Sequence, residues 1–187
     1  MELLKLEKKY EGKFLSYYVA TYKNKEGGIK LYELISRDKN LTIEKFHHGM
    51  PQGVGMVALS LDGEKILMQK EFRMATNEWV YNFPAGLIDE GETAEIAAKR
   101  ELREETGLEL KEIIKTLPPS YASQGTSDEM MTIVICKVQG EIKESNHIDE
   151  EIEARWFTKS EAKKLLEDGA LFSVRTQMFV YMWVNEK

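Results

Sequence analysis

Cysteine is almost absent from this 187-residue chain. The one cysteine, Cys136, lies in an apolar run and cannot form an internal disulfide, so nothing indicates an oxidising compartment. No window of about eighteen apolar residues occurs, and the first residues contain no apolar signal core. Repeats and low-complexity segments are also missing. We therefore expect a cytoplasmic protein that does not insert into a membrane.

Basic residues are too few for a general polyanion-binding surface. The chain has 26 Lys and Arg against 32 Asp and Glu, a net charge of −6, so nucleic acid is not an expected partner. The hydrophobic share of 42% and the charged share of 31% are typical of a soluble globular protein. A small phosphorylated ligand stays compatible with this charge, because a bound cation can neutralise it locally.

The N-terminal part has the character of β-structure. Residues 14–22 and 29–37 are rich in aromatic and β-branched side chains, and the turn composition KNKEGG between them predicts a hairpin. Residues 41–46 are predicted to add a strand. The following HHGMPQGVG breaks the pattern, so we expect an N-terminal β-strand domain over 1–48 and a second domain over 49–187.

The second domain mixes strands with helices. The segments GMVALSL and KILMQKEF around DGE predict another hairpin. Helices are expected from about Thr93 to Thr106, after the capping box that Thr158 opens, and over the apolar C-terminal stretch. Further strands are predicted at EWVYNF, LKEIIKTL, MMTIVICKV and EARWF. Because strands and helices do not alternate strictly, an α/β fold with a mixed sheet fits better than a doubly wound one.

Carboxylates gather on the helix predicted over 93–106. At about 100° per residue, Glu101 and Glu105 share a narrow arc with small alanines such as Ala98, and Glu104 borders it. Alanines allow close approach to other backbone, so the glutamates are expected to point into a cleft. Like charges at i,i+4 repel, and a hard divalent cation bound through oxygens would remove the conflict. A solvated acidic face is the alternative.

The same stretch fills a motif of fixed spacing, G-x5-E-x7-R-E-U-x-E-E-x-G-U, in which U is a bulky aliphatic residue. Its fixed positions are occupied by Gly86, Glu92, Arg100, Glu101, Leu102, Glu104, Glu105, Gly107 and Leu108. This is the Nudix box, and the chain resembles the Nudix hydrolases. The resemblance implies the Nudix fold, an α/β/α sandwich with a mixed β-sheet, preceded here by a small N-terminal antiparallel β domain.

The resemblance also implies roles for the box residues. Glu101 and Glu105 would be the principal metal ligands, and Glu104 a further ligand or a water contact. Arg100 would orient the carboxylates through charge-assisted hydrogen bonds, and the backbone carbonyl of Ala85 would join the coordination. The implied cofactor is Mg²⁺, with Mn²⁺ as a substitute. Such ions would neutralise a pyrophosphate and help to place water.

Outside the box, LYELISR, KEFR and EWVYNFPAGLIDEGE resemble the ADP-ribose pyrophosphatase branch. That branch implies that 1–48 serves in dimerisation and base binding, with N-terminal strands exchanged across a homodimer, and that 49–187 is catalytic. The implied activity is hydrolysis of ADP-ribose to AMP and ribose 5-phosphate. Another nucleotide sugar or nucleoside diphosphate derivative is the alternative. A non-catalytic ligand sensor is disfavoured, because all box glutamates are present.

Positions that match the branch imply further site residues. Arg73 would contact the substrate phosphates, with a surface salt bridge as the alternative. Phe14 and Tyr32 would sandwich the adenine, with ordinary strand packing as the alternative. Glu150 or Glu151, in a loop before the last strand, would bind metal or act as general base, unless the loop is simply solvated.

One position departs from the branch pattern. The loop YASQGTSDEM has Gln124 where the branch commonly has the proline of Ser-Pro-Gly. In the branch this loop contacts the distal part of the substrate, so Gln124 is expected to lie at the substrate. The preference for a terminal ribose is therefore open.

Overall fold

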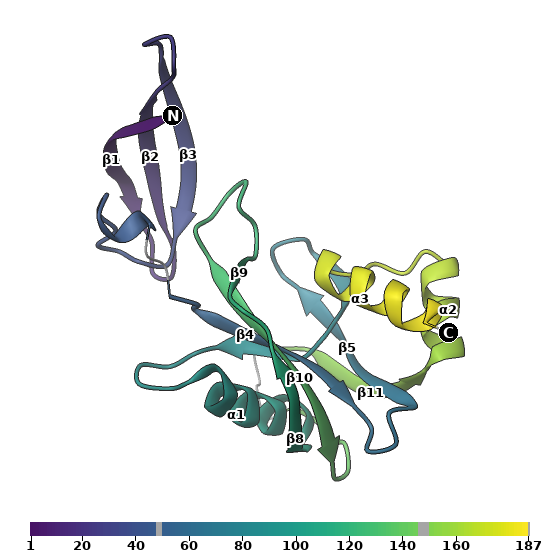
Figure 1. The fold of residues 1–187 in the computed structure, drawn as a ribbon. Coiled ribbons are helices and arrows are strands. Elements are labelled where there is room, and N and C mark those ends of the chain that lie inside the picture. The colour runs from purple at the N-terminus through teal and green to yellow at the C-terminus, as the bar shows by residue number, and fades with distance from the viewer. Residues whose placement is uncertain (48–49, 146–149, 187) are drawn as a thin grey trace. The chain divides into compact units, whose positions relative to one another are not determined.

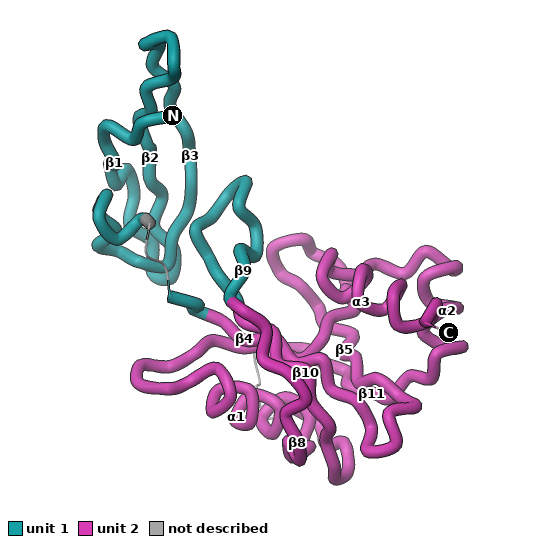
Figure 2. Tube along the Cα trace, viewed as in Figure 1, with its two compact units in different colours: residues 1–52, 119–131 teal, residues 53–118, 132–187 magenta. Residues whose placement is uncertain are grey.

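The computed structural model describes residues 1–47, 50–145 and 150–186, which form two compact units (Figure 2). The first unit comprises residues 1–52 and 119–131, and the second comprises 53–118 and 132–187. The predicted boundary between 48 and 49 lies outside the described residues and stays a prediction. Within the described ranges, no helix has the length and apolar character that crossing a membrane requires.

The first unit is built on a three-stranded antiparallel sheet (Figure 1). Its strands, in the order in which they pair, are β1 (Glu2–Glu11), β2 (Ser16–Lys23) and β3 (Ile29–Ser36). The predicted hairpin of β2 and β3 is confirmed. Tyr18, Ala20 and Leu34 form the small core of this sheet, because alternate side chains of β2 and β3 point to one face.

The strand predicted over residues 41–46 is wrong. The chain turns there and forms the short 3-10 helix η1 (Lys45–His47). Thr42 favours the turn, because its carbonyl accepts the N–H of Phe46 at 2.9 Å and its hydroxyl accepts the N–H of Lys45 at 3.4 Å. Such local hydrogen bonds compete with pairing in a sheet and outweigh the β-propensity of Leu, Thr and Ile.

The main sheet belongs largely to the second unit and has the strand order β11-β5-β4-β10-β8, with β6 paired to β5 and β7 to β4. The β4–β5 hairpin predicted around DGE is confirmed. In the first unit, the short β9 (Ser120–Tyr121) pairs with the first residues of β10. The other strands are β4 (Gly53–Leu59), β5 (Lys65–Arg73), β6 (Glu78–Asn82), β7 (Ala85–Leu87), β8 (Glu109–Thr116), β10 (Met130–Gln139) and β11 (Ile152–Thr158).

Helices cover both faces of this sheet (Figure 1). Met56 of β4 packs in a core with helix α1 (Ala94–Thr106), whereas the next residue, Val57, packs in a core with α2 (Lys159–Glu167) and α3 (Val174–Asn185). The predicted capping box of α2 is confirmed, with Thr158 and Glu161 binding each other's backbone N–H. The sheet thus lies between two helical layers, as the expected sandwich requires.

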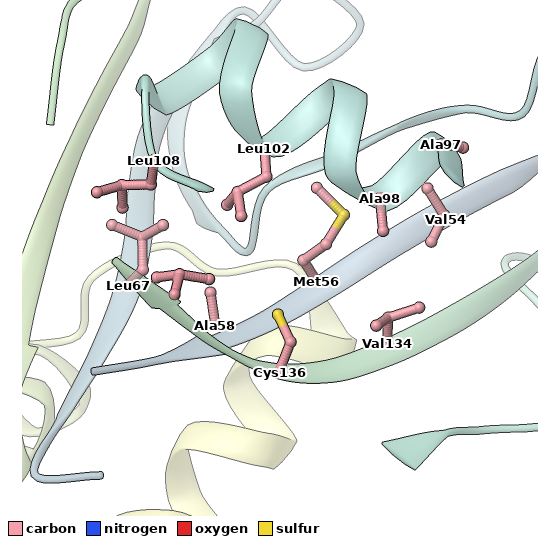
Figure 3. Close-up of a cluster of buried hydrophobic side chains, with 11 residues drawn as sticks. Val54, Met56, Ala58, Leu67, Ala97, Ala98, Leu102, Leu108, Val134 and Cys136 are labelled. Atoms are coloured by element: carbon pink, nitrogen blue, oxygen red, sulfur yellow. The ribbon is translucent and has the colours of Figure 1, made fainter. Parts of the chain in front are cut away.

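Helix α1 is fixed at its ends and along its inner face. Thr93 is the N-cap, and its hydroxyl accepts the N–H of Ile96 at 3.3 Å. Gly107 ends the helix with φ = 74°, a left-handed conformation that favours glycine. Figure 3 shows Ala98 and Leu102 projecting from α1 into the core that includes β4, and both are fully buried. The small alanines let the helix lie close to the sheet.

Candidate functional site

The carboxylates of α1 lie on the arc that helical periodicity predicts. Glu101 is 9% exposed and Glu105 is 6% exposed, although both are acidic. Lys99 and Arg103, across the helix, are exposed, and Glu104 at the border is half-buried. The solvated-face alternative is therefore wrong for Glu101 and Glu105. Buried carboxylates are costly unless they are paired, so their partners define the chemistry of the site.

Gly86, the first residue of the motif, makes room for Glu101. A methyl group placed on Gly86 would lie 1.9 Å from Cδ of Glu101, which no side chain tolerates. The glycine is in β7, which pairs with β4 and contacts α1. A carboxylate therefore lies directly over the backbone of β7, and only glycine leaves the space for it.

Arg100 forms hydrogen bonds with three of the acidic residues. Its Nε and Nη2 bind the two oxygens of Glu92 at 3.0 and 2.8 Å, a bidentate pair that lowers the pKa of Glu92 and raises that of Arg100. Its Nη1 binds Glu101 at 2.7 Å and Glu104 at 3.4 Å. Nη2 also donates to the carbonyl of Leu87 at 2.9 Å. The arginine is thus held in one orientation, consistent with an orienting role.

Glu105 has neutral partners only. Its Oε2 accepts hydrogen bonds from Nε2 of Gln69 at 2.9 Å and from the N–H of Ala85 at 3.2 Å. No lysine or arginine in the described part of the chain pairs with it. Burial, together with the nearby carboxylates of Glu101 and Glu71, raises the pKa of Glu105 to about 8, against the lowering effect of the hydrogen bonds from Gln69 and Ala85. The ionised form of Glu105 therefore has no cationic side chain beside it in the described residues.

The residues present fit a hard divalent cation. The donors are carboxylate and backbone oxygens, which Mg²⁺ and Mn²⁺ prefer, and the raised pKa marks a place where added positive charge is favourable. Within residues 1–47, 50–145 and 150–186, no three acidic, His or Cys side chains already converge on a metal position. Arg100 binds oxygens of Glu101 and Glu104. A cation would compete with Arg100 for these oxygens.

Two polar residues beside Glu105 were not found from the sequence. Gln69 is 1% exposed, and Glu71 is close enough to influence the pKa of Glu105. Both lie on β5, which the sequence identified only as a strand. A polar residue inside the apolar run ILMQ was the available signal for Gln69, since a buried amide needs a partner. Nothing in the spacing indicated which partner it has.

Arg73 ends β5 and forms an ion pair with Glu71, whose other oxygen accepts the amide of Asn82 at 2.9 Å. The salt-bridge alternative thus describes Arg73 as it stands here, and phosphate contact stays a prediction.

Glu150 and Glu151 are exposed and line a hollow of about 470 Å³. The carbonyl of Glu151 accepts the N–H of Phe72, at the edge of the sheet. The roles of Glu150 and Glu151 as metal ligand or general base stay predictions.

The remaining predicted residues lie in the first unit. The Tyr32 hydroxyl donates to the carbonyl of Gly125 at 2.7 Å, next to Gln124. Tyr32 and Gln124 line the same cavity of about 430 Å³, together with aromatic side chains including Tyr22. Phe14 lies in the β1–β2 turn, is 68% exposed, and does not line that cavity. The structure thus brings two of the three predicted residues together.

Comparison with known proteins gives the same family as the motif. The NUDIX domain model matches residues 49–175, so the chain belongs to the Nudix family, with the mixed sheet and separate N-terminal sheet expected. It is an enzyme of the Nudix hydrolase type, a family that generally uses a divalent metal.

Individual relatives show which Nudix hydrolases this chain is similar to. The ADP-ribose pyrophosphatase of Bacillus subtilis is 28% identical over 183 residues, covering 96% of this chain and 91% of that protein. The ADP-sugar pyrophosphatase of Mus musculus is 30% identical over 132 residues, covering 70% and 58%. The solved structure of an ADP compounds hydrolase matches with a TM-score of 0.75 at 21% identity, covering 97% of this chain and 91% of that one, which establishes the fold.

We predict a pH-dependent stability difference between the wild type and Glu105→Gln. The pKa of Glu105 is raised from 4.5 to about 8 in the folded protein, so ionisation destabilises the fold. In metal-free buffer, the free energy of unfolding of Glu105→Gln minus that of the wild type should increase as pH rises from about 4.5 to 8. This difference in the free energy of unfolding is measured by urea unfolding in buffer that contains EDTA. A difference that is independent of pH would contradict the burial argument, and added Mg²⁺ should reduce the difference.

Proposed function

We propose that this chain is a Mg²⁺-dependent pyrophosphatase that hydrolyses ADP-ribose to AMP and ribose 5-phosphate. The observation that carries the proposal is the burial of Glu105 beside Glu101 with no cationic partner among the described residues, on the helix that bears the Nudix box. A diphosphate brings further negative charge, so such a site needs a divalent cation before it can bind the substrate. The similarity to ADP-ribose and ADP-sugar pyrophosphatases supports the substrate class.

The box residues are proposed to hold the metal. Glu101 and Glu105 are the principal ligands, Glu104 is a further ligand or water contact, and the carbonyl of Ala85 completes the set. Mn²⁺ is a substitute for Mg²⁺ with the same oxygen donors. When bound, the ion supplies charge neutralisation and Lewis acidity to the diphosphate. The bidentate contact of Arg100 with Glu92 supports its role in orienting the carboxylates.

The hydrolytic step consumes one water molecule. Its oxygen forms a bond to one phosphorus of the diphosphate, and the bond from that phosphorus to the bridging oxygen breaks, which releases AMP and ribose 5-phosphate. We assign the general base to Glu150 or Glu151, which would accept the proton of the water. Arg73 is proposed to leave Glu71 and contact the phosphates, a contact that its exposed position allows.

The first unit is proposed to bind the nucleoside. The cavity beside Tyr32 presents aromatic side chains, which stack on a base such as adenine. Phe14 is more than two-thirds exposed, with Nζ of Lys13 4.9 Å from its ring centroid, and its ring is proposed to cover the other face of the base. Gln124 is proposed to contact the distal part of the substrate.

We propose a homodimer with exchanged N-terminal strands and a cytoplasmic location. The exposed side chains of Ile29 and Leu31 on the edge strand β3 support the dimer, since apolar edges of this kind pair or are covered in stable proteins. The location is supported by Cys136, which is a buried free thiol.

A related nucleotide sugar is the second candidate substrate. Gln124 replaces the proline that the branch commonly has, and it lines the cavity of the first unit rather than lying outside it. An amide at this position offers hydrogen bonds that a proline lacks, so the group recognised there can differ from ribose. The match to an ADP-sugar pyrophosphatase is consistent with this alternative.

The substrate proposal predicts the order of rates in a hydrolysis panel. With Mg²⁺ present, ADP-ribose should have a higher kcat/KM than ADP-, UDP- and GDP-sugars, dinucleoside polyphosphates and oxidised nucleoside triphosphates. The products are separated by ion-exchange chromatography. A clearly higher kcat/KM for another compound would identify that compound as the substrate in place of ADP-ribose. Tight binding without turnover of any compound would indicate a sensor.

Glu105→Gln should lower kcat by more than about a hundredfold and leave the fold intact. Even the supporting partners of metal ligands typically contribute about 10- to 100-fold, so a ligand should contribute more. The matched control is Glu109→Gln, an exposed glutamate just after the same helix, which should keep the wild-type kcat within about twofold. Near-wild-type activity of Glu105→Gln would rule out its assignment as a ligand.

The dimer proposal predicts the molar mass in solution. Light scattering during size-exclusion chromatography should give twice the mass of one chain. Leu31→Lys should shift the wild-type peak towards the monomer, because it places charge on the exposed apolar strand. Leu61→Lys, at an exposed leucine of the β4–β5 turn, should not. A monomeric wild type at micromolar concentration would exclude the exchanged dimer.

A further inference from the structure

Gln69 is a buried polar residue on a strand that is otherwise apolar at its inner positions. It is 1% exposed and lies two residues after Leu67, on the face of β5 that packs under α1. A buried amide without a partner costs free energy, so a glutamine at this position needs a specific contact. That contact is Glu105, whose Oε2 accepts the Nε2 hydrogen at 2.9 Å.

Two donors meet on a single oxygen of Glu105. Gln69 and the N–H of Ala85 both donate to Oε2, one from β5 and one from β7. Oε1 accepts no hydrogen bond from any residue in the described ranges. The carboxylate therefore cannot rotate without breaking two buried hydrogen bonds, and Oε1 is the oxygen that remains for an incoming group.

The donor at this position is neutral, which matters for a cation. Arg100 already neutralises Glu92, Glu101 and Glu104 in part. A lysine or arginine at position 69 would neutralise Glu105 as well and repel a metal ion. An amide instead fixes the geometry of the carboxyl group and places no competing positive charge beside it.

We propose that Gln69 is a positioning residue that holds Glu105 with Oε1 directed to the metal and thereby sets the affinity of the site for divalent cations. The inference rests on the proposed function, because it takes Glu105 as a metal ligand. It acts through Glu105 and does not require Gln69 to touch metal or substrate. A purely packing role for Gln69 would affect stability but not cation affinity.

The test compares Gln69→Met with Leu67→Met. Methionine at 69 keeps a similar volume and removes the N–H donor, whereas methionine at 67 is a volume-conserving change in the same strand and on the same face. Mn²⁺ binding without substrate is measured by electron paramagnetic resonance of the free ion. Gln69→Met should weaken Mn²⁺ binding about 10- to 100-fold, the effect typical of residues that orient metal ligands. Leu67→Met should bind within about twofold of the wild type.

Equal Mn²⁺ affinity of folded Gln69→Met and the wild type would overturn the proposal. Should Gln69→Met fail to fold, as circular dichroism would reveal, the wild type supplies the second measurement. The side-chain amide resonance of Gln69 in ¹⁵N spectra should shift on addition of Mg²⁺, and an unchanged resonance at saturating Mg²⁺ would overturn the proposal. A wild type that binds no divalent ion would instead overturn the metal assignment in the proposed function, so the two failures are distinguishable.

Discussion

The burial of Glu105 beside Glu101 without a cation of its own is the constraint on which the rest of the site depends. Both carboxylates are withdrawn from water on the inner side of α1. Arg100 compensates Glu101, but Glu105 has only the amide of Gln69 and a backbone N–H. A divalent cation bound at this position, as the proposed function requires, would make ionisation of the buried carboxyl group favourable.

Local features of the fold hold that arrangement in place. Gly86 lets Glu101 lie over the backbone of β7, and the alanines at 97 and 98 bring α1 close to the sheet. The helix is fixed by its Thr93 cap and its Gly107 terminus. These contacts are made within the protein and fix the position of the helix and its carboxylates.

The features predicted correctly were those with a local physical cause. Helical periodicity placed Glu101 and Glu105 on one buried arc, and the turn compositions located both hairpins. The strand β1 was missed, because its many charged residues mask the alternation that marks a strand. The side-chain hydrogen bonding of Thr42 reversed the prediction for 41–46. Gln69 meets Glu105 only through the packing of β5 against α1, a long-range contact that no sequence spacing encodes.

The first unit and the box site carry separate parts of the proposed function. In the proposal, the aromatic cavity at Tyr32 binds the base, and the carboxylates hold the cation that binds the diphosphate.

The most direct test of the central claim is the anomalous diffraction of crystals grown with Mn²⁺, recorded at the manganese absorption edge. A peak within coordination distance of Glu101 and Oε1 of Glu105 is predicted. Fully occupied crystals with no peak there, or with manganese bound only elsewhere, would contradict the account.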